Sequence, residues 1–355
     1  MSRPRDGGGC GLWVVGCHKT STHNSQSAIH NDQRGSILLY VVWAIGLLSL
    51  FTVSVSAQAM FALDVTERLS KQLRAAYLAK SALQYAWLAL HRDPTPTVDG
   101  LAERWSDAPD IFQTHQLAGG IFTVAAREPD GSRVRYGLTD EERSLSLNGA
   151  PEEVLQRFFE FMGVSRYEAA ELASAIEDWR DPDDDQRPLG AERFYYRSLG
   201  QPYDCKNGPF ENLEELLLVR GMTPSLYRAA APYLTVYGSG RLNLNTAGPT
   251  ALKALGLSQA GVGGLLSFRA GEDGREGTAD DRLLVSVDGI ESQLGASLPA
   301  EDLARLAQLA RDKALGVHAD DVRLEIRAET SGPSSRASVV CVINRAGMVK
   351  LWSEQ

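Results

Sequence analysis

A run of acidic residues in the middle of the chain is the segment whose side chains could most readily do chemistry. Six carboxylates crowd into DWRDPDDDQRPLGAE, residues 178–192, namely Asp178, Asp181, Asp183, Asp184, Asp185 and Glu192. Crowded carboxylates repel one another, and a hard divalent cation such as Ca2+, which accepts about six to eight oxygen ligands, relieves that repulsion. A solvated loop with Asp at turn and cap positions explains the same residues, so both interpretations stay open.

A second acidic loop, GEDGREGTADD, occupies residues 271–281. It combines glycines, which calcium-wrapping loops often need, with Asp273, Glu276, Asp280 and Asp281. These four residues are a second candidate metal site, and an ordinary surface turn is the alternative.

Other reactive residue types do not form a recognisable catalytic pattern. The six histidines are scattered, and no Ser-His-Asp set, Cys-His pair or phosphate-binding loop is evident. Four cysteines are present, of which Cys10 and Cys17 precede the apolar segment described below. Cys205 and Cys341 could pair in an oxidising compartment or remain free. We therefore expect a protein that is not an enzyme.

The charge balance bears on the partners of the protein. The chain has 36 basic and 45 acidic residues, a net charge of -9. Because phosphate backbones are bound by Lys and Arg, this balance argues against nucleic acid as a partner.

The elements that must hold the acidic loops are helical, and they contain an internal similarity. LSLNGAPEEVL, residues 145–155, and LNLNTAGPTAL, residues 242–252, each read as a strand end, a turn and a helix. Pro151 and Pro249 suit the first turn of a helix. The second copy resembles DNA-binding helix-hairpin-helix modules, but only Lys253 and Arg269 are basic there. We expect a related fold without DNA binding.

Segments with strand character lie on both sides of this helical middle. Residues 120–126 and 133–136 predict a hairpin, and the alternating residues 322–328, 338–343 and 348–352 predict strands near the C-terminus. The helical part is therefore expected to be inserted within a sheet.

The N-terminal region predicts a membrane helix. Residues 36–63 form a 28-residue stretch without a charge, longer than the roughly 20 residues that cross a bilayer. A buried core helix and a cleaved secretory signal are the alternatives. Apolar positions continue at helical spacing from Val65 through Leu69 and Leu73 to Leu90, until Asp93-Pro94 ends the pattern. The sequence favours one continuous helix, half in lipid and half amphipathic.

The junction before this helix resembles the class III signal of type IV pilins and pseudopilins. Gln33-Arg34-Gly35 meets an abrupt hydrophobic start, and the resemblance implies that a prepilin peptidase cuts between Gly35 and Ser36, followed by methylation of the new N-terminus. Basic residues in the leader favour a cytoplasmic N-terminus and an exported C-terminal domain. Tyr40 stands at the fifth mature position, where the family usually has Glu. Such a residue suits a subunit at the leading end of a filament, which has no neighbour ahead to neutralise.

Taken in order along the chain, these features resemble the minor pseudopilin K of type II secretion systems. The resemblance rests on the leader junction, the absent Glu and a series of segments, which are residues 175–181, 190–192, 195–196, 206–210, 214–222 and 242–247. It implies an α+β fold with a long N-terminal transmembrane and stem helix, a pilin-like antiparallel sheet and a large inserted helical domain of helix-hairpin-helix or SAM-like type.

The corresponding domain boundaries follow from the same resemblance. They are 1–35 for the leader, 36–63 for the transmembrane helix, 64–93 for the stem, 94–137 for the first part of the sheet, 138–316 for the inserted domain and 317–355 for the returning strands.

The resemblance also implies a function. It predicts an inner-membrane, single-pass subunit at the tip of the pseudopilus that initiates assembly for protein export. Its expected partners are other minor pseudopilins, the major pseudopilin, the prepilin peptidase and the inner-membrane secretion platform. It implies Ca2+ ligands at Asp181, Asp183, Asp185 and Glu192, with Asp178 as a further candidate. The alternatives are a membrane-anchored DNA-binding protein of the competence type and a type IV pilus tip adhesin.

Overall fold

A computed structural model describes residues 34–355 except 118, 129–130, 132 and 332–334, and for residues 34–36 it describes the backbone only. The leader predicted for residues 1–35 thus lies almost wholly outside the described residues, and so do Cys10 and Cys17. The chain divides into two units, residues 1–64 and residues 65–355, and each is described by itself.

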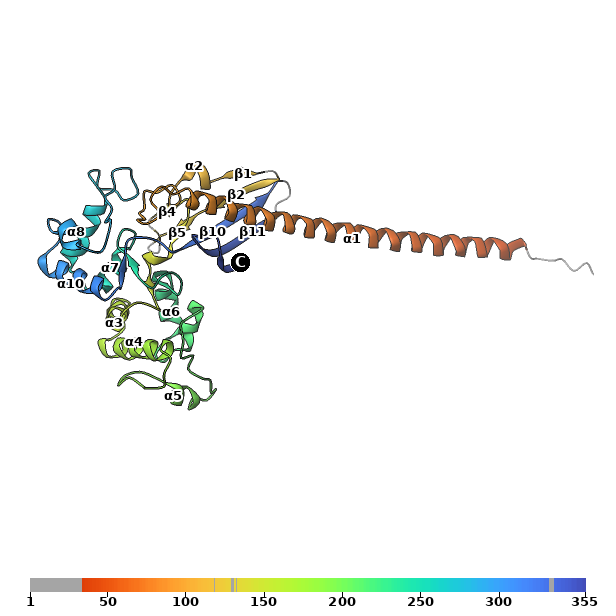
Figure 1. The fold of residues 1–355 in the computed structure, drawn as a ribbon. Helices are drawn as coiled ribbons and strands as arrows, with labels where there is room; N and C mark the ends of the chain where they lie inside the picture. Colours follow the sequence, from red (N-terminus) through yellow and green to blue (C-terminus); the bar gives the residue numbers. More distant parts are fainter. Residues whose placement is uncertain (1–33, 118, 129–130, 132, 332–334) are drawn as a thin grey trace, which may run out of the picture. The chain divides into compact units, whose positions relative to one another are not determined.

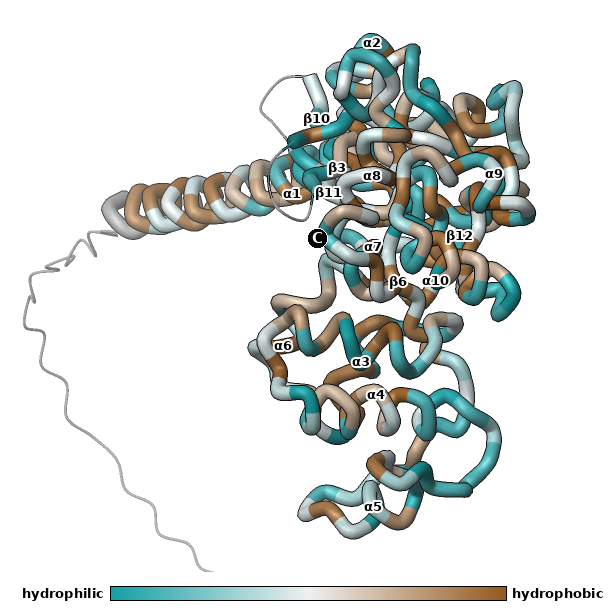
Figure 2. Tube along the Cα trace, turned by 90° about the vertical axis from the view of Figure 1, so that its left-hand side faces the viewer, coloured by the Kyte–Doolittle hydropathy of each residue, from teal (hydrophilic) through white to brown (hydrophobic). Residues whose placement is uncertain are grey.

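The first unit contains the N-terminal part of helix α1, Arg34–His91. Its apolar side chains, such as Leu38, Trp43 and Phe51, are exposed, and in Figure 2 hydrophobic residues recur along this stretch. By length and composition α1 could cross a membrane. The predicted apolar helix is confirmed, and its exposed side chains are those expected of a segment meant for lipid.

In the second unit, the end of α1 packs against the rest of the fold. Its buried face begins at Ala75 and continues through Leu78, Ala82 and Ala86 to Leu90 at helical spacing. Val65, Leu69 and Leu73, which were predicted to belong to this face, are exposed. Helix α1 ends at His91, because Asp93-Pro94 cannot continue it, as predicted.

This face of α1 packs against an antiparallel sheet (Figure 1). Its strand order is β1-β2-β10-β11-β12, and a short strand β5 also pairs with β10. Strands from both ends of the second unit therefore meet, since Ile326 pairs with Val124 and Val339. The bounds are β1 His115–Leu117, β2 Gly120–Val124, β5 Thr139–Asp140, β10 Asp321–Thr330, β11 Arg336–Asn344 and β12 Val349–Glu354, with helix α2 Pro109–Phe112 before β1.

The predicted hairpin is divided between two sheets. Strands β3, Ala126–Arg127, and β4, Val134–Arg135, pair with each other as expected. The preceding residues Gly120–Val124 instead pair with β10 in the main sheet. The strands predicted near the C-terminus are confirmed as β10, β11 and β12.

Between β5 and β10 the chain forms two helical modules, after the 3-10 turn η1, Glu141–Arg143. In each module a first strand pairs in parallel with a last strand, Leu145 with Leu234 and Leu242 with Leu315. The first module consists of β6 Leu145–Ser146, α3 Glu152–Phe161, α4 Arg166–Arg180, α5 Arg193–Arg197, η2 Leu213–Leu218, α6 Pro224–Ala230, η3 Ala231–Tyr233 and β7 Leu234–Thr235. The second consists of β8 Leu242–Asn243, α7 Pro249–Ala254, α8 Gln259–Arg269, α9 Ile290–Leu294, α10 Ala300–Arg311 and β9 Leu315–Gly316.

The internal similarity is a structural repeat that extends to individual hydrogen bonds. The Asn148 amide donates to the carbonyls of Phe210 and Val236 and accepts from the Phe210 N–H. The Asn245 amide makes the equivalent three contacts with Leu284 and Val317. Each asparagine therefore joins the segment after the first strand of its module to the segment after the last strand and to a loop between them.

An arginine at the end of the second helix repeats as well. Arg180, at the end of α4, donates to the carbonyls of Leu147 and Ala150. Arg269, at the end of α8, donates to those of Leu244 and Ala247, the same positions of the repeat. Residues 181–192 of the first acidic loop follow Arg180, and the second acidic loop begins two residues after Arg269, so the repeat holds both loops at equivalent places.

Cys205 and Cys341 are both buried and free. Cys205 belongs to the core of the helical modules, and Cys341 belongs to the core between the sheet and α1. The disulfide that the sequence left open therefore does not form.

Candidate functional site

Aromatic side chains pack around the end of helix α4, where the first acidic loop begins. Trp179, in the last turn of α4, packs edge-on against Tyr196 with ring centroids 5.3 Å apart and lies 6.4 Å from Phe210. Arg180 anchors the same turn to the first strand of the module. Helix α4 ends at Arg180, and its C-cap Asp181 places the following carboxylates of the loop at the C-terminus of the helix.

Three of the predicted ligands converge in this loop. Asp181, Asp183 and Glu192 each offer a carboxylate oxygen, and these oxygens lie within 4.8 Å of one another. Glu192 is 3% exposed, yet neither of its carboxylate oxygens has a hydrogen-bond partner, and Asp181 Oδ1 also has none. Buried oxygens without donors are rare in folded proteins, because they forgo their interactions with water.

The raised pKa of Glu192 also indicates that its negative charge lacks a favourable partner. Burial, together with the negative charges of Asp178 and Asp181, raises the pKa of Glu192 to about 7. A cation between the carboxylates would remove this unfavourable interaction and supply the missing partners.

Asp178 and Asp185 play other parts in the loop. Asp178 is fully buried and accepts from the Arg187 backbone N–H and, at 3.1 Å, from the Arg187 guanidinium. Its carboxylate packs so closely on Gly190 that a Cβ there would lie 2.0 Å from Asp178 Oδ2. Asp185 is exposed, and its N–H donates to Asp183 Oδ1 at 2.9 Å. Both shape the loop but lie outside the convergent group of three.

The donor set of the three convergent residues fits a hard cation. It consists of carboxylate oxygens, with no His or Cys in the group, and Ca2+ prefers such ligands whereas zinc favours nitrogen and sulfur. Calcium binding itself stays a prediction.

In the second acidic loop the carboxylates are engaged by the protein itself. Asp280 accepts from the Thr278 hydroxyl and from the N–H groups of Asp273 and Glu272, and these donors lower the pKa of Asp280 to about 2. Asp281 accepts from the Gly277 N–H, Asp273 from the Arg275 N–H, and Glu276 pairs with Arg269. Within the described residues these four do not form a convergent group of ligands, and the second site also remains a prediction.

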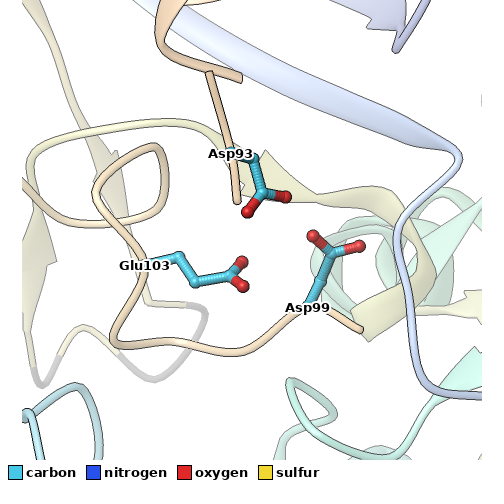
Figure 3. A group of neighbouring side chains, drawn as sticks. All are labelled: Asp93, Asp99 and Glu103. Atoms are coloured by element: carbon cyan, nitrogen blue, oxygen red, sulfur yellow. The ribbon is translucent and has the colours of Figure 1, made fainter. Parts of the chain in front are cut away.

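Sequence reasoning missed another carboxylate cluster, after the end of α1. The side chains of Asp93, Asp99 and Glu103 point toward one another in Figure 3, with oxygens within 4.8 Å. Arg345, from the turn between β11 and β12, forms ion pairs with Asp93 and Asp99. Only the spacing of these acids along the chain could have signalled the cluster, because Arg345 is brought in by the fold.

Comparison with known proteins shows which proteins this chain is similar to. A family model described as type II secretion system protein K matches residues 137–239. The type II secretion system protein K of Aeromonas hydrophila is 28% identical over 243 residues, which cover 65% of this chain and 73% of the relative. That of Klebsiella pneumoniae is 26% identical over 234 residues, with 61% and 67% covered.

A chain in the crystal structure of the GspK-GspI-GspJ complex of enterotoxigenic Escherichia coli has the same fold. The TM-score is 0.59 at 19% sequence identity, and the match covers 84% of this chain and 99% of that chain.

The shared architecture is a membrane-capable helix that leads to an antiparallel sheet, with helical modules inserted between the strands. In sequence the chain is similar to protein K of type II secretion systems, over residues 137–239 in the family model and over about 60–65% of the chain in the two relatives.

Proposed function

We propose that this minor pseudopilin occupies the tip of the type II secretion pseudopilus and initiates its assembly. The observation that carries the proposal is the bulk of the two modules, which interrupt the sheet between β5 and β10. Subunits that repeat along a filament must pack side by side, and an insertion of this size would obstruct such packing. At the tip, one face has no neighbour to obstruct.

The position at the tip predicts few copies per filament. Quantitative mass spectrometry of purified pseudopili should find this subunit far below the level of the major pseudopilin. A copy number close to that of the major pseudopilin would contradict the proposal.

The membrane topology is part of the same proposal. The prepilin peptidase removes the leader by cutting between Gly35 and Ser36, and α1 then anchors the subunit in the inner membrane with its N-terminus toward the cytoplasm. The intact mass of the chain, isolated from cells with and without the peptidase, tests this processing. A mature protein that still begins at Met1, or is cut beyond residue 57, would overturn it.

The proposed partners are the other minor pseudopilins, the major pseudopilin and the inner-membrane secretion platform. The solved structure of similar fold is itself a complex of GspK with GspI and GspJ, which supports the first of these. Co-purification of the full chain with each candidate from membranes provides the measurement.

We further propose that Asp181, Asp183 and Glu192 bind Ca2+ and that the ion stabilises the loop. The three oxygens without donors on Glu192 and Asp181 support this. An ion that binds only the folded state raises the melting temperature. The full chain in detergent should therefore melt higher in Ca2+ than in chelator, and Glu192→Gln should remove most of the difference. Asp288→Asn, an exposed residue of another loop, should not. Equal midpoints with Ca2+ and chelator would refute the site.

A further inference from the structure

Although the protein is acidic overall, four of its arginines line one cavity. The cavity has a volume of about 380 Å3 and lies where the β3–β4 hairpin meets both helical modules. The arginines come from separate elements, Arg133 and Arg135 from the hairpin, Arg143 from the end of η1 and Arg269 from the end of α8. Folding therefore brings Arg269 to three arginines that lie close together in the sequence.

The protein neutralises these charges only in part. Glu128 and Glu276 are the carboxylates among the lining residues. Glu128 forms ion pairs with two arginines, since it accepts from Arg135 Nε at 2.8 Å and from Arg143 Nη2 at 2.6 Å. Arg133 pairs at 2.6 Å with Asp107, which does not line the cavity, so four guanidinium groups meet three carboxylates and one positive charge is left in excess.

Two of the guanidinium groups are deeply buried, and each has one nitrogen without a hydrogen-bond partner. Arg135 is 4% exposed and Arg269 is 3% exposed. Arg135 donates to Glu128 and to the Ser106 hydroxyl, but its Nη2 has no partner. Arg269 pairs with Glu276 and donates to two carbonyls, but its Nε has no partner. A buried donor without an acceptor is costly, and a charged one more so.

The pKa values of Arg135 and Arg269 are lowered by their surroundings. Burial and the neighbouring Arg143 lower the pKa of Arg135 to about 10, and burial lowers that of Arg269. An anion in the cavity would reverse both effects by offering acceptors and negative charge.

We propose that this cavity binds a small oxyanion, a phosphate group carried either by inorganic phosphate or by a small phosphate ester. Guanidinium groups match the geometry of such oxygens and bind them through paired N–H donors. The volume suits a small ligand and leaves room for a substituent on the phosphate. Because residues from the hairpin and from both modules line the cavity, a bound oxyanion would cross-link them.

Thermal unfolding of the full chain in detergent, without added calcium, tests this site. Sodium phosphate should raise the midpoint above that in sodium chloride of equal ionic strength, in a saturable manner. Glycerol 3-phosphate provides the second arm. An equal rise identifies the bare oxyanion as the recognised group, and a rise with glycerol 3-phosphate alone identifies a phosphate ester.

Variants locate the effect. Arg143→Gln and the more exposed Arg133→Gln should each weaken the apparent phosphate affinity at least tenfold. Arg104→Gln removes an exposed arginine that does not line this cavity and should respond like the wild type. The proposal is overturned if neither phosphate compound raises the midpoint beyond chloride, or if both cavity variants retain the wild-type response. Should Arg143→Gln fail to fold, Arg133→Gln alone decides.

Discussion

Individual carboxylates in this protein differ mainly in whether the fold supplies them with donors. Asp280 is surrounded by N–H groups of its own loop, whereas the buried oxygens of Glu192 have none. Composition describes the two acidic loops alike, and the difference between them lies in the donors that surround Asp280 and are missing at Glu192. The shape of that loop depends on Gly190, the one residue that lets the Asp178 carboxylate approach the backbone.

Gly190→Ala tests this close contact. The added Cβ would lie 2.0 Å from Asp178 Oδ2, so the loop must shift, and we expect a loss of about 1–3 kcal/mol in the free energy of unfolding. The variant should also lose part of its stabilisation by Ca2+. Urea denaturation with and without Ca2+ is the measurement.

Gly200→Ala is the matched control for this change. Its Cβ meets no atom within 4 Å and its φ is not positive, so its effect should stay within about 0.5 kcal/mol. Equal stability of the two variants would show that the Gly190 contact does not shape the loop.

At the scale of elements, the repeat explains how short strands and helices become ordered. Strands β6 to β9 have two residues each, too few for stable pairing alone. Asn148 and Asn245 reinforce them by replacing missing backbone partners with side-chain donors and acceptors. The same hydrogen bonds recur in both copies, including those of Arg180 and Arg269, so the two modules order their short strands in the same way.

Asn148→Ala and Asn245→Ala should therefore cost similar amounts. Each leaves backbone groups of a neighbouring segment without a partner in the interior, and we expect roughly 2–3 kcal/mol of lost stability for each variant. Gln156→Ala, which removes a partly buried side-chain pair within α3 and leaves no backbone group without a partner, should cost less than about 0.5 kcal/mol. Chemical denaturation of the three variants gives these values. A cost near that of the control for either asparagine would refute its structural role.

At the scale of the whole second unit, the cluster of Asp93, Asp99 and Glu103 joins segments from distant parts of the chain. Asp99 accepts from the Ala319 N–H at 2.6 Å and pairs with Arg345, so the end of α1, the return from the modules and the β11–β12 turn meet there. Burial, followed by the charges of Asp99 and Asp93, raises the pKa of Glu103 to about 8.

This shift makes stability depend on pH. In the unfolded chain Glu103 ionises near its usual pKa of 4.5, whereas the folded protein keeps the proton until about pH 8. Protonated Glu103 therefore favours the fold at low pH, and its contribution is lost as the pH rises from about 4.5 to about 8. Between pH 5 and pH 8 the wild type should lose more stability than Glu103→Gln, which cannot ionise.

Urea denaturation at the two pH values measures the difference, with Glu301→Gln as an exposed control that should follow the wild type. Parallel pH profiles for the wild type and Glu103→Gln would contradict the role of this carboxyl group.

Local patterns in the sequence were enough to predict most of the elements and the similarity to protein K of type II secretion systems. The apolar helix, its end before Pro94, the C-terminal strands and the repeated strand-turn-helix segments all depend on neighbouring residues, whose spacing is visible in the chain itself. The exposure of Val65, Leu69 and Leu73 was missed, because periodicity identifies an apolar face but not what covers it.

Tertiary structure alone decided which charged groups meet. Five carboxylates were candidate ligands in the first acidic loop, and the fold brings three of them together while Arg187 holds Asp178 and Asp185 stays exposed. Arg345 reaches Asp99, and Arg269 joins Arg143 at one cavity, across separations that no local pattern encodes. Coulombic interactions depend on distance in space, and in this protein those distances are set by how the modules and the sheet pack.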